Sequence, residues 1–216
     1  MTNFNDVVSQ FRIEGTVESV SPIGNGLINE TLRVKTVDAN TPDYILQRIN
    51  NAIFTDVDLL QHNIELVTDH IRHKLMEKGE TDIERKCLRF VQAKDGKTYY
   101  KDADNLYWRV SVFIPNAVTK EEVNPESAFC CGETFGNFQN MLVDLKEPLG
   151  ETIPDFHNME LRLRQLREAV SADKAGRVAS VKDILAELER DADEMCLAER
   201  LYREGALPKR ICHCDT

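Results

Sequence analysis

The sequence has 216 residues, of which 42% are hydrophobic and 30% charged, and its formal net charge at pH 7 is −10. This composition is ordinary for a folded protein, and a chain of this length can bury one large core or two smaller ones. The acidic balance argues against a broad basic surface for nucleic acids or anionic membranes, although a phosphate site needs only one or two cations.

The six cysteines do not follow the pattern of a disulfide-stapled secreted module. Cys130 and Cys131 are adjacent within a helical pattern, and Cys212-His213-Cys214 has no second ligand pair at the spacing of a zinc site. The amino terminus has no apolar signal core, and no apolar run approaches the ~20 residues of a membrane span. We therefore expect a cytoplasmic protein with neither a membrane span nor a nucleic-acid partner.

Residues 1–115 predict strands and one helix. The segment 11–21 alternates like a strand, and after a turn rich in glycine the alternation resumes over 30–37, which predicts a hairpin. A third strand is expected over 43–49. Apolar residues then recur at intervals of three and four from Val57 to Leu75, which predicts an amphipathic helix that ends near Gly79.

After this helix the sequence again predicts strands, up to residue 114. Asp95-Gly96 is a typical hairpin turn, so we expect it to join strands over 88–93 and 97–101. Another strand is expected over 107–114, where Pro115 ends it.

The remaining residues are mainly helical by periodicity. Apolar stripes predict helices over 128–145, 159–170 and 181–195, and a short strand is expected over 210–212. The sequence thus predicts an α+β fold with two parts. A β-rich lobe with one helix spans 1–115, and the start of a mostly helical lobe spans 116–216.

Two features of the first part could bind phosphate. The turn Gly24-Asn25-Gly26 would let backbone N–H groups approach phosphate oxygens, but it is equally typical of a tight hairpin. Arg48 lies at the end of the third strand and could hold phosphate, with Glu65 of the following helix as its ion-pair partner. Solvated surface charges would give the same pattern.

The end of the sequence contains a candidate base. Asp215 follows the predicted short strand, where a carboxylate could accept a proton from a substrate hydroxyl, while His213 would brace the loop. A chain end without function remains the alternative. The order of glycine turn, cation, acidic helix, helical part and His-x-Asp is that of a kinase-like fold.

The amino-acid sequences of several segments also resemble the motifs of a known family. They resemble the aminoglycoside-phosphotransferase-like superfamily, which has the protein-kinase-like fold, and within it the N-acetylhexosamine 1-kinase-like group. The segments that carry the resemblance are 22–31, 44–50, 107–110, 153–157 and 207–211, followed by His213-x-Asp215-Thr216.

The resemblance implies ATP-dependent phosphorylation of the anomeric hydroxyl of a small sugar, with Mg²⁺ as the metal. Asp215 would be the catalytic base, and His157 would lie near the sugar unless it is a buried structural histidine. The nucleotide would be bound by a phosphate-covering loop, a cation with its acidic partner, and a hinge that contacts adenine; by motif position these are Gly24, Asn25, Gly26 and Asn29, then Arg48 and Glu65, then Val112, Phe113 and Ile114.

The sequence departs from the family pattern at three points. Arg48 stands where a lysine is usual, and Cys214 stands where an asparagine is usual. The magnesium ligands are expected beyond residue 216, so we expect this chain alone to be inactive and to expose apolar helix faces over 129–145 that could form a homodimer.

Two alternatives remain open, and a third is disfavoured. The protein could bind nucleotide without catalysis, or it could phosphorylate another acceptor such as homoserine, choline, methylthioribose or an aminoglycoside. A sulfatase would require a Cys/Ser-x-Pro-x-Arg segment, which the sequence lacks.

Overall fold

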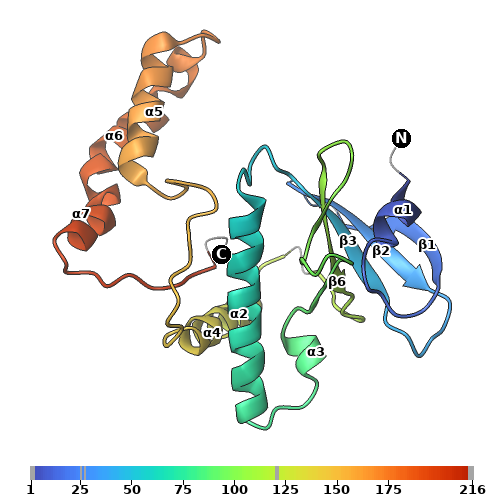
Figure 1. The fold of residues 1–216 in the computed structure, drawn as a ribbon. Helices are drawn as coiled ribbons and strands as arrows, with labels where there is room; N and C mark the ends of the chain where they lie inside the picture. The colour runs from blue at the N-terminus through green and yellow to red at the C-terminus, as the bar shows by residue number, and fades with distance from the viewer. Residues whose placement is uncertain (1–2, 25, 27, 120–121, 214–216) are drawn as a thin grey trace. The chain divides into compact units, whose positions relative to one another are not determined.

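The computed structural model describes all residues except 1–2, 25, 27, 120–121 and 214–216. The chain forms two compact units, which are described separately (Figure 1). The first contains the chain up to Thr152 together with His213, and the second contains Ile153–Cys212. The lobe boundary expected at residue 115 stays a prediction.

The first unit is built on one antiparallel sheet of six strands. In spatial order it runs β1-β2-β3-β6-β4, and β5 also pairs with β6. The arrangement is α+β and is compatible with the kinase-like fold expected from the sequence. The strands are β1 (Val17–Pro22), β2 (Glu30–Thr36), β3 (Tyr44–Ile49), β4 (Phe90–Val91), β5 (Tyr100–Lys101) and β6 (Tyr107–Val112).

The two faces of the sheet carry different helices (Figure 1). On one face, called the α1 face, Leu46 and Val110 are fully buried in the main core together with residues of α1 (Phe4–Val8). On the other, the α2 face, Ile49 packs with the first residue of α2 (Val57–Glu77). Because side chains alternate along a strand, each strand residue is assigned to one face by its number.

The long helix α2 forms where the sequence predicts it. Asp56 caps its start by accepting a hydrogen bond from the Leu59 N–H at 2.9 Å, and the helix continues to Glu77. The expectation of a single helix before residue 115 is wrong, because α1 and α3 (Ile83–Lys86) are also present. Helices of five and four residues are too short to produce a recognisable apolar period.

One predicted strand boundary and one predicted strand pairing are wrong. The first strand begins at Val17, and Phe11 forms only an isolated bridge with Ala93. The expected hairpin turn does form, with Gly96 at φ +91° and a hydrogen bond from the Ala93 N–H to the Lys97 carbonyl. However, β4 and β5 each pair with β6 rather than with each other.

Helix α4 (Pro125–Met141) belongs to the first unit and has no fully buried residue. Phe129 is 72% exposed, which confirms the expected apolar exposure at that position, whereas Leu142 beyond the helix end is buried. A homodimer through this helix stays a prediction.

The second unit consists of helices, as predicted. Ion pairs connect its first helix to later ones, Arg167 to Glu189 at 2.5 Å and Arg203 to Glu160 at 2.7 Å. The strand expected over 210–212 is wrong, since that segment has no regular structure. The elements are α5 (Met159–Ala172), the 3-10 turn η1 (Val178–Val181), α6 (Lys182–Met195) and α7 (Leu197–Arg203), of which the last was not expected.

Asp43 joins β2 to β3 and makes the stability of this unit depend on pH. Its carboxylate accepts hydrogen bonds from the Thr36 backbone N–H at 2.9 Å and from the Arg33 guanidinium at 2.6 Å. Partial burial opposes ionisation, but these hydrogen bonds and the nearby charge outweigh it and lower the pKa of Asp43. A carboxyl with a lowered folded-state pKa stabilises the fold above its unfolded pKa and loses that contribution as the pH falls.

We therefore expect Asp43→Asn to cost about 1–2 kcal/mol at pH 7 and to reduce the loss of stability between about pH 4 and pH 2. Urea unfolding across this pH range measures both effects. Asp104→Asn, at an exposed turn position, is the control. Equal acid sensitivity of the wild type and Asp43→Asn would contradict the prediction.

Candidate functional site

The connection between β1 and β2 contains the predicted glycine loop. The Ile23 N–H donates to the Thr31 carbonyl at 3.0 Å and closes the base of the loop. Gly24 adopts φ +73°, a conformation that favours glycine, and a Cβ there would meet nothing within 4 Å. Asn29 accepts a hydrogen bond from the Asn50 N–H at 2.9 Å, which anchors the loop to the end of β3.

The phosphate-covering role of this loop stays a prediction. Asn25 lies outside the described residues. A Cβ added at Gly26 would lie 3.4 Å from the carbonyl oxygen of Asn29, which is van der Waals distance. What the structure establishes is a loop tied at its base, with open space beside Gly24.

Next to this loop, a polar row crosses the α2 face of the sheet and ends on helix α2; its members are Thr31, Gln47 and Arg109 of the strands and Gln61 of the helix. Gln47 in β3 lies opposite Thr31 in β2 and opposite Arg109 in β6. The Gln47 amide donates to the Thr31 hydroxyl at 3.0 Å. Its oxygen Oε1 accepts from Arg109 Nε at 2.9 Å and from Nη2 at 2.6 Å.

The polar row continues into helix α2. Arg109 Nη1 donates to Gln61 Oε1 at 3.1 Å, and Gln61 is 2% exposed. The Gln61 amide donates to the Thr98 hydroxyl at 3.0 Å, and that hydroxyl donates in turn to Glu65. Glu65 is therefore connected to the Arg109 guanidinium through two neutral side chains and does not touch it.

Arg109 is a partly buried cation held by neutral groups. Burial lowers the pKa of Arg109 to about 10, so the guanidinium remains charged at neutral pH. The Phe90 ring lies below it, 5.5 Å from the guanidinium carbon to the ring centroid. Over the described parts of the chain, no carboxylate lies within ion-pair distance of Arg109.

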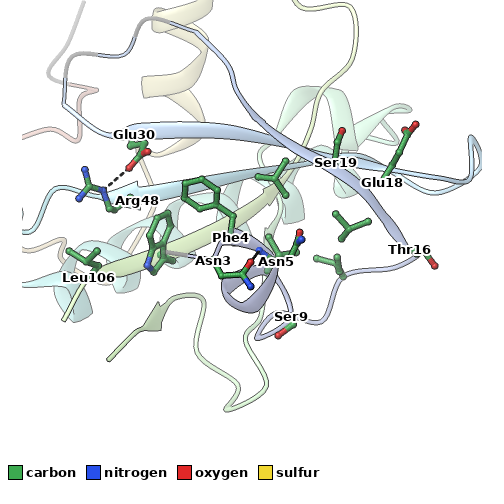
Figure 2. A pocket seen from close by; sticks show the side chains of 15 residues that line it. Asn3, Phe4, Asn5, Ser9, Thr16, Glu18, Ser19, Glu30, Arg48 and Leu106 are labelled. Atoms are coloured by element: carbon green, nitrogen blue, oxygen red, sulfur yellow. Dashed lines mark hydrogen bonds and ion pairs between the residues drawn. The ribbon is translucent and has the colours of Figure 1, made fainter. Parts of the chain in front are cut away.

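Arg48 lies on the α1 face, away from α2. Its number places it with Leu46, and its Nε forms an ion pair with Glu30 at 2.9 Å (Figure 2). The expected ion pair between Arg48 and Glu65 is therefore wrong. The physical reason is strand alternation: Gln47, one residue earlier, faces α2.

The cavity beside Arg48 has a volume of about 740 Å³ and lies between α1 and the sheet (Figure 2). Its lining includes Asn3, Phe4, Glu30, Arg48, Leu106 and Trp108. A nucleotide role for Arg48 stays a prediction, and it would have to act from this face.

The expected adenine hinge follows β6. The Val112 N–H donates to the Arg89 carbonyl and the Phe113 N–H to the Asp43 carbonyl, each at 2.9 Å. Both amides are therefore used within the fold. Contact of adenine with Val112, Phe113 or Ile114 stays a prediction.

The predicted catalytic segment is described only in part. Asp215 and Cys214 lie outside the described residues. The His213 ring lies edge-on to Phe135 and Phe138 of α4, at centroid distances of 5.4 and 6.1 Å. These contacts agree with the expectation that His213 braces the segment.

His157 lies in the second unit and is exposed, with its ring 4.6 Å from that of Phe156. The alternative of a buried structural histidine is therefore wrong, while contact with a sugar stays a prediction. In the described portion of the molecule, no three His, Cys, Asp or Glu residues are grouped closely enough to hold a metal ion. The helices described there also include none with the length and apolarity to cross a membrane.

Fold and site together define an α+β protein in which a glycine loop adjoins a polar, cationic sheet face. The family model of the phosphotransferase enzyme family (APH) matches residues 19–216, all but the first 18 of the 216 residues. The chain belongs to this family, whose members are kinase-like transferases of small molecules.

The residues of the polar row were missed by sequence reasoning. Gln47 and Arg109 both lie in segments that carry the family resemblance, but neither received a role. The available signal was alternation in the third strand, because the apolar residues Tyr44 and Leu46 share a face with Arg48 and not with Gln47.

Proposed function

We propose that the protein is an ATP-dependent phosphotransferase whose acceptor is the anomeric hydroxyl of an N-acetylhexosamine. The observation that carries the reaction class is the family match over residues 19–216, since kinases of this family generally use ATP and Mg²⁺. The glycine loop and the charged sheet face beside it suit a nucleoside triphosphate. The choice of an N-acetylhexosamine rests on the resemblance of the sequence segments.

In this reaction Asp215 would accept the proton of the sugar hydroxyl as its oxygen attacks the γ-phosphorus of ATP. The bond to the β-phosphate oxygen breaks, and ADP leaves. Backbone N–H groups of the loop around Gly24 would hold the phosphates, which positions the transferred group. Mg²⁺, when bound, would neutralise charge that develops on the phosphates.

An ADP-release assay with the purified protein tests the proposal. We expect ADP to form only when N-acetylglucosamine or N-acetylgalactosamine is present, with one sugar 1-phosphate formed for each ADP. Transfer to homoserine, choline, methylthioribose or an aminoglycoside, with none to the sugars, would overturn the acceptor and keep the reaction class. ATP binding without transfer to any acceptor would favour a non-catalytic nucleotide-binding protein.

The inactivity expected from the sequence stays a prediction, because no described residue bears on it. Sulfatase activity remains disfavoured, since the sequence lacks the Cys/Ser-x-Pro-x-Arg segment that it requires.

A further inference from the structure

Within the part of the chain that the structure describes, Arg109 is a partly buried cation with no carboxylate paired to it. Three of its N–H groups donate to the amide oxygens of Gln47 and Gln61. Amide oxygens satisfy hydrogen bonds but carry no full negative charge. Taking a cation out of water without a neutralising partner is unfavourable, so an unpaired and partly buried guanidinium favours a bound anion.

The hydrogen bonds of Arg109 leave donors for that anion. A guanidinium has five N–H donors, so two of those of Arg109 have no acceptor within the described residues. The planar fork of an arginine matches two oxygens of a phosphate group. Gln47 accepts from Nε and Nη2 and Gln61 accepts from Nη1, which fixes the direction of the fork before any ligand arrives.

The position of Arg109 in the sheet relates this cation to the glycine loop. Arg109 lies in the same row as Gln47 and Thr31, and the Thr31 carbonyl accepts the hydrogen bond that closes the loop. The row therefore crosses the sheet at the base of the loop, on the face that carries α2.

We propose that Arg109, rather than Arg48, is the cation that binds the phosphates of the nucleotide in this protein. The proposal rests on the proposed function for the identity of the anion as ATP, and on the described contacts for the anion site itself. Glu65 then acts as a positioning residue through Thr98 and Gln61, because it orients the side chain that holds Arg109.

Arg48 is the competing candidate. It differs from Arg109 in the charge of its neighbours and in the face of the sheet on which it lies. It is already paired with Glu30, and it lies on the α1 face with Trp108. Its positive charge is thus balanced by a carboxylate, and no such partner is found for Arg109 in the described residues.

Calorimetric titration of the purified protein with ATP, inorganic tripolyphosphate and adenosine tests the proposal. We expect Arg109→Gln to weaken ATP and tripolyphosphate binding by about 10- to 100-fold, because a charge-assisted pair of hydrogen bonds is lost. Adenosine has no phosphate, so we expect its binding to be unchanged. Arg109→Lys should recover part of the loss. Arg48→Gln should change each dissociation constant by less than about twofold, because the charge of Arg48 is already paired with Glu30 and lies on the α1 face.

Phenylglyoxal modification of the unaltered protein provides a second measurement that does not depend on the folding of a variant. We expect ATP and tripolyphosphate to protect Arg109 from the reagent and to leave Arg48 reactive, as read by peptide mass mapping. Protection of Arg48 alone, or unchanged ATP affinity in Arg109→Gln, would overturn the proposal while the proposed function stands. Tripolyphosphate binding that depends on Arg109, with no binding of ATP, would keep the anion site and overturn the proposed function. Failure of the wild type to bind either would overturn both.

Discussion

Trp108→Ala is expected to lower the free energy of unfolding by about 3–5 kcal/mol, the range found when a large buried aromatic residue is truncated. Trp108 is 1% exposed and is the largest of the fully buried side chains. Its ring meets Phe4 of α1 edge-on, with centroids 5.9 Å apart, and its Nε1–H donates to Asp102 at 2.8 Å. The substitution removes the side chain that joins α1 to the middle of the sheet and leaves a cavity there.

Urea unfolding followed by circular dichroism measures this change, and Trp108→Phe is the matched control. Phenylalanine keeps most of the apolar volume but cannot donate to Asp102, which still accepts backbone hydrogen bonds from Asp104 and Leu106 at 2.9 Å each. We therefore expect Trp108→Phe to cost about 1–2 kcal/mol. A loss below about 1 kcal/mol for Trp108→Ala would show that α1 does not depend on this contact.

The contrast between long and short elements explains how much of the fold the sequence could predict. The stripe from Val57 to Leu75 repeats over five turns of helix, so chance could not produce it, and α2 was predicted correctly. Strands β4 and β5 have two residues each, and their place in the sheet depends on hydrogen bonds to β6. Local sequence contains no information on such a distant partner, so the expected pairing of the two was wrong.

The site could be predicted less well, for a similar reason. Arg48 was chosen because it is the charged residue in its strand, and Glu65 because it is an acidic residue on the next helix. The cation on the α2 face, Arg109, is 62 residues away from Gln47 and reaches it only through the register of β3 and β6. Alternation could have excluded an Arg48–Glu65 pair, but only the sheet order could have named Arg109 as the replacement.

Gln47→Glu is expected to give Arg109 a carboxylate of the protein itself in place of a bound anion. The new carboxylate would stand where the Gln47 amide now accepts from Arg109 Nε and Nη2, a geometry suited to a two-bond ion pair. The Thr31 hydroxyl, which now accepts from the Gln47 amide at 3.0 Å, can rotate and donate to the second carboxylate oxygen. All the groups of the row remain hydrogen-bonded, so we expect the melting temperature not to fall.

The same substitution should weaken ATP and tripolyphosphate binding by about 10- to 100-fold, because the charge of Arg109 is neutralised by the new carboxylate and is no longer available to the phosphates. A purely structural role for the row predicts the opposite combination, a fall in stability with nucleotide affinity retained in the folded fraction. Combining Gln47→Glu with Arg109→Gln separates the two accounts. If the carboxylate acts on ATP through Arg109, the double variant should bind little more weakly than Arg109→Gln alone, and additive losses would show that the two residues act on the nucleotide independently.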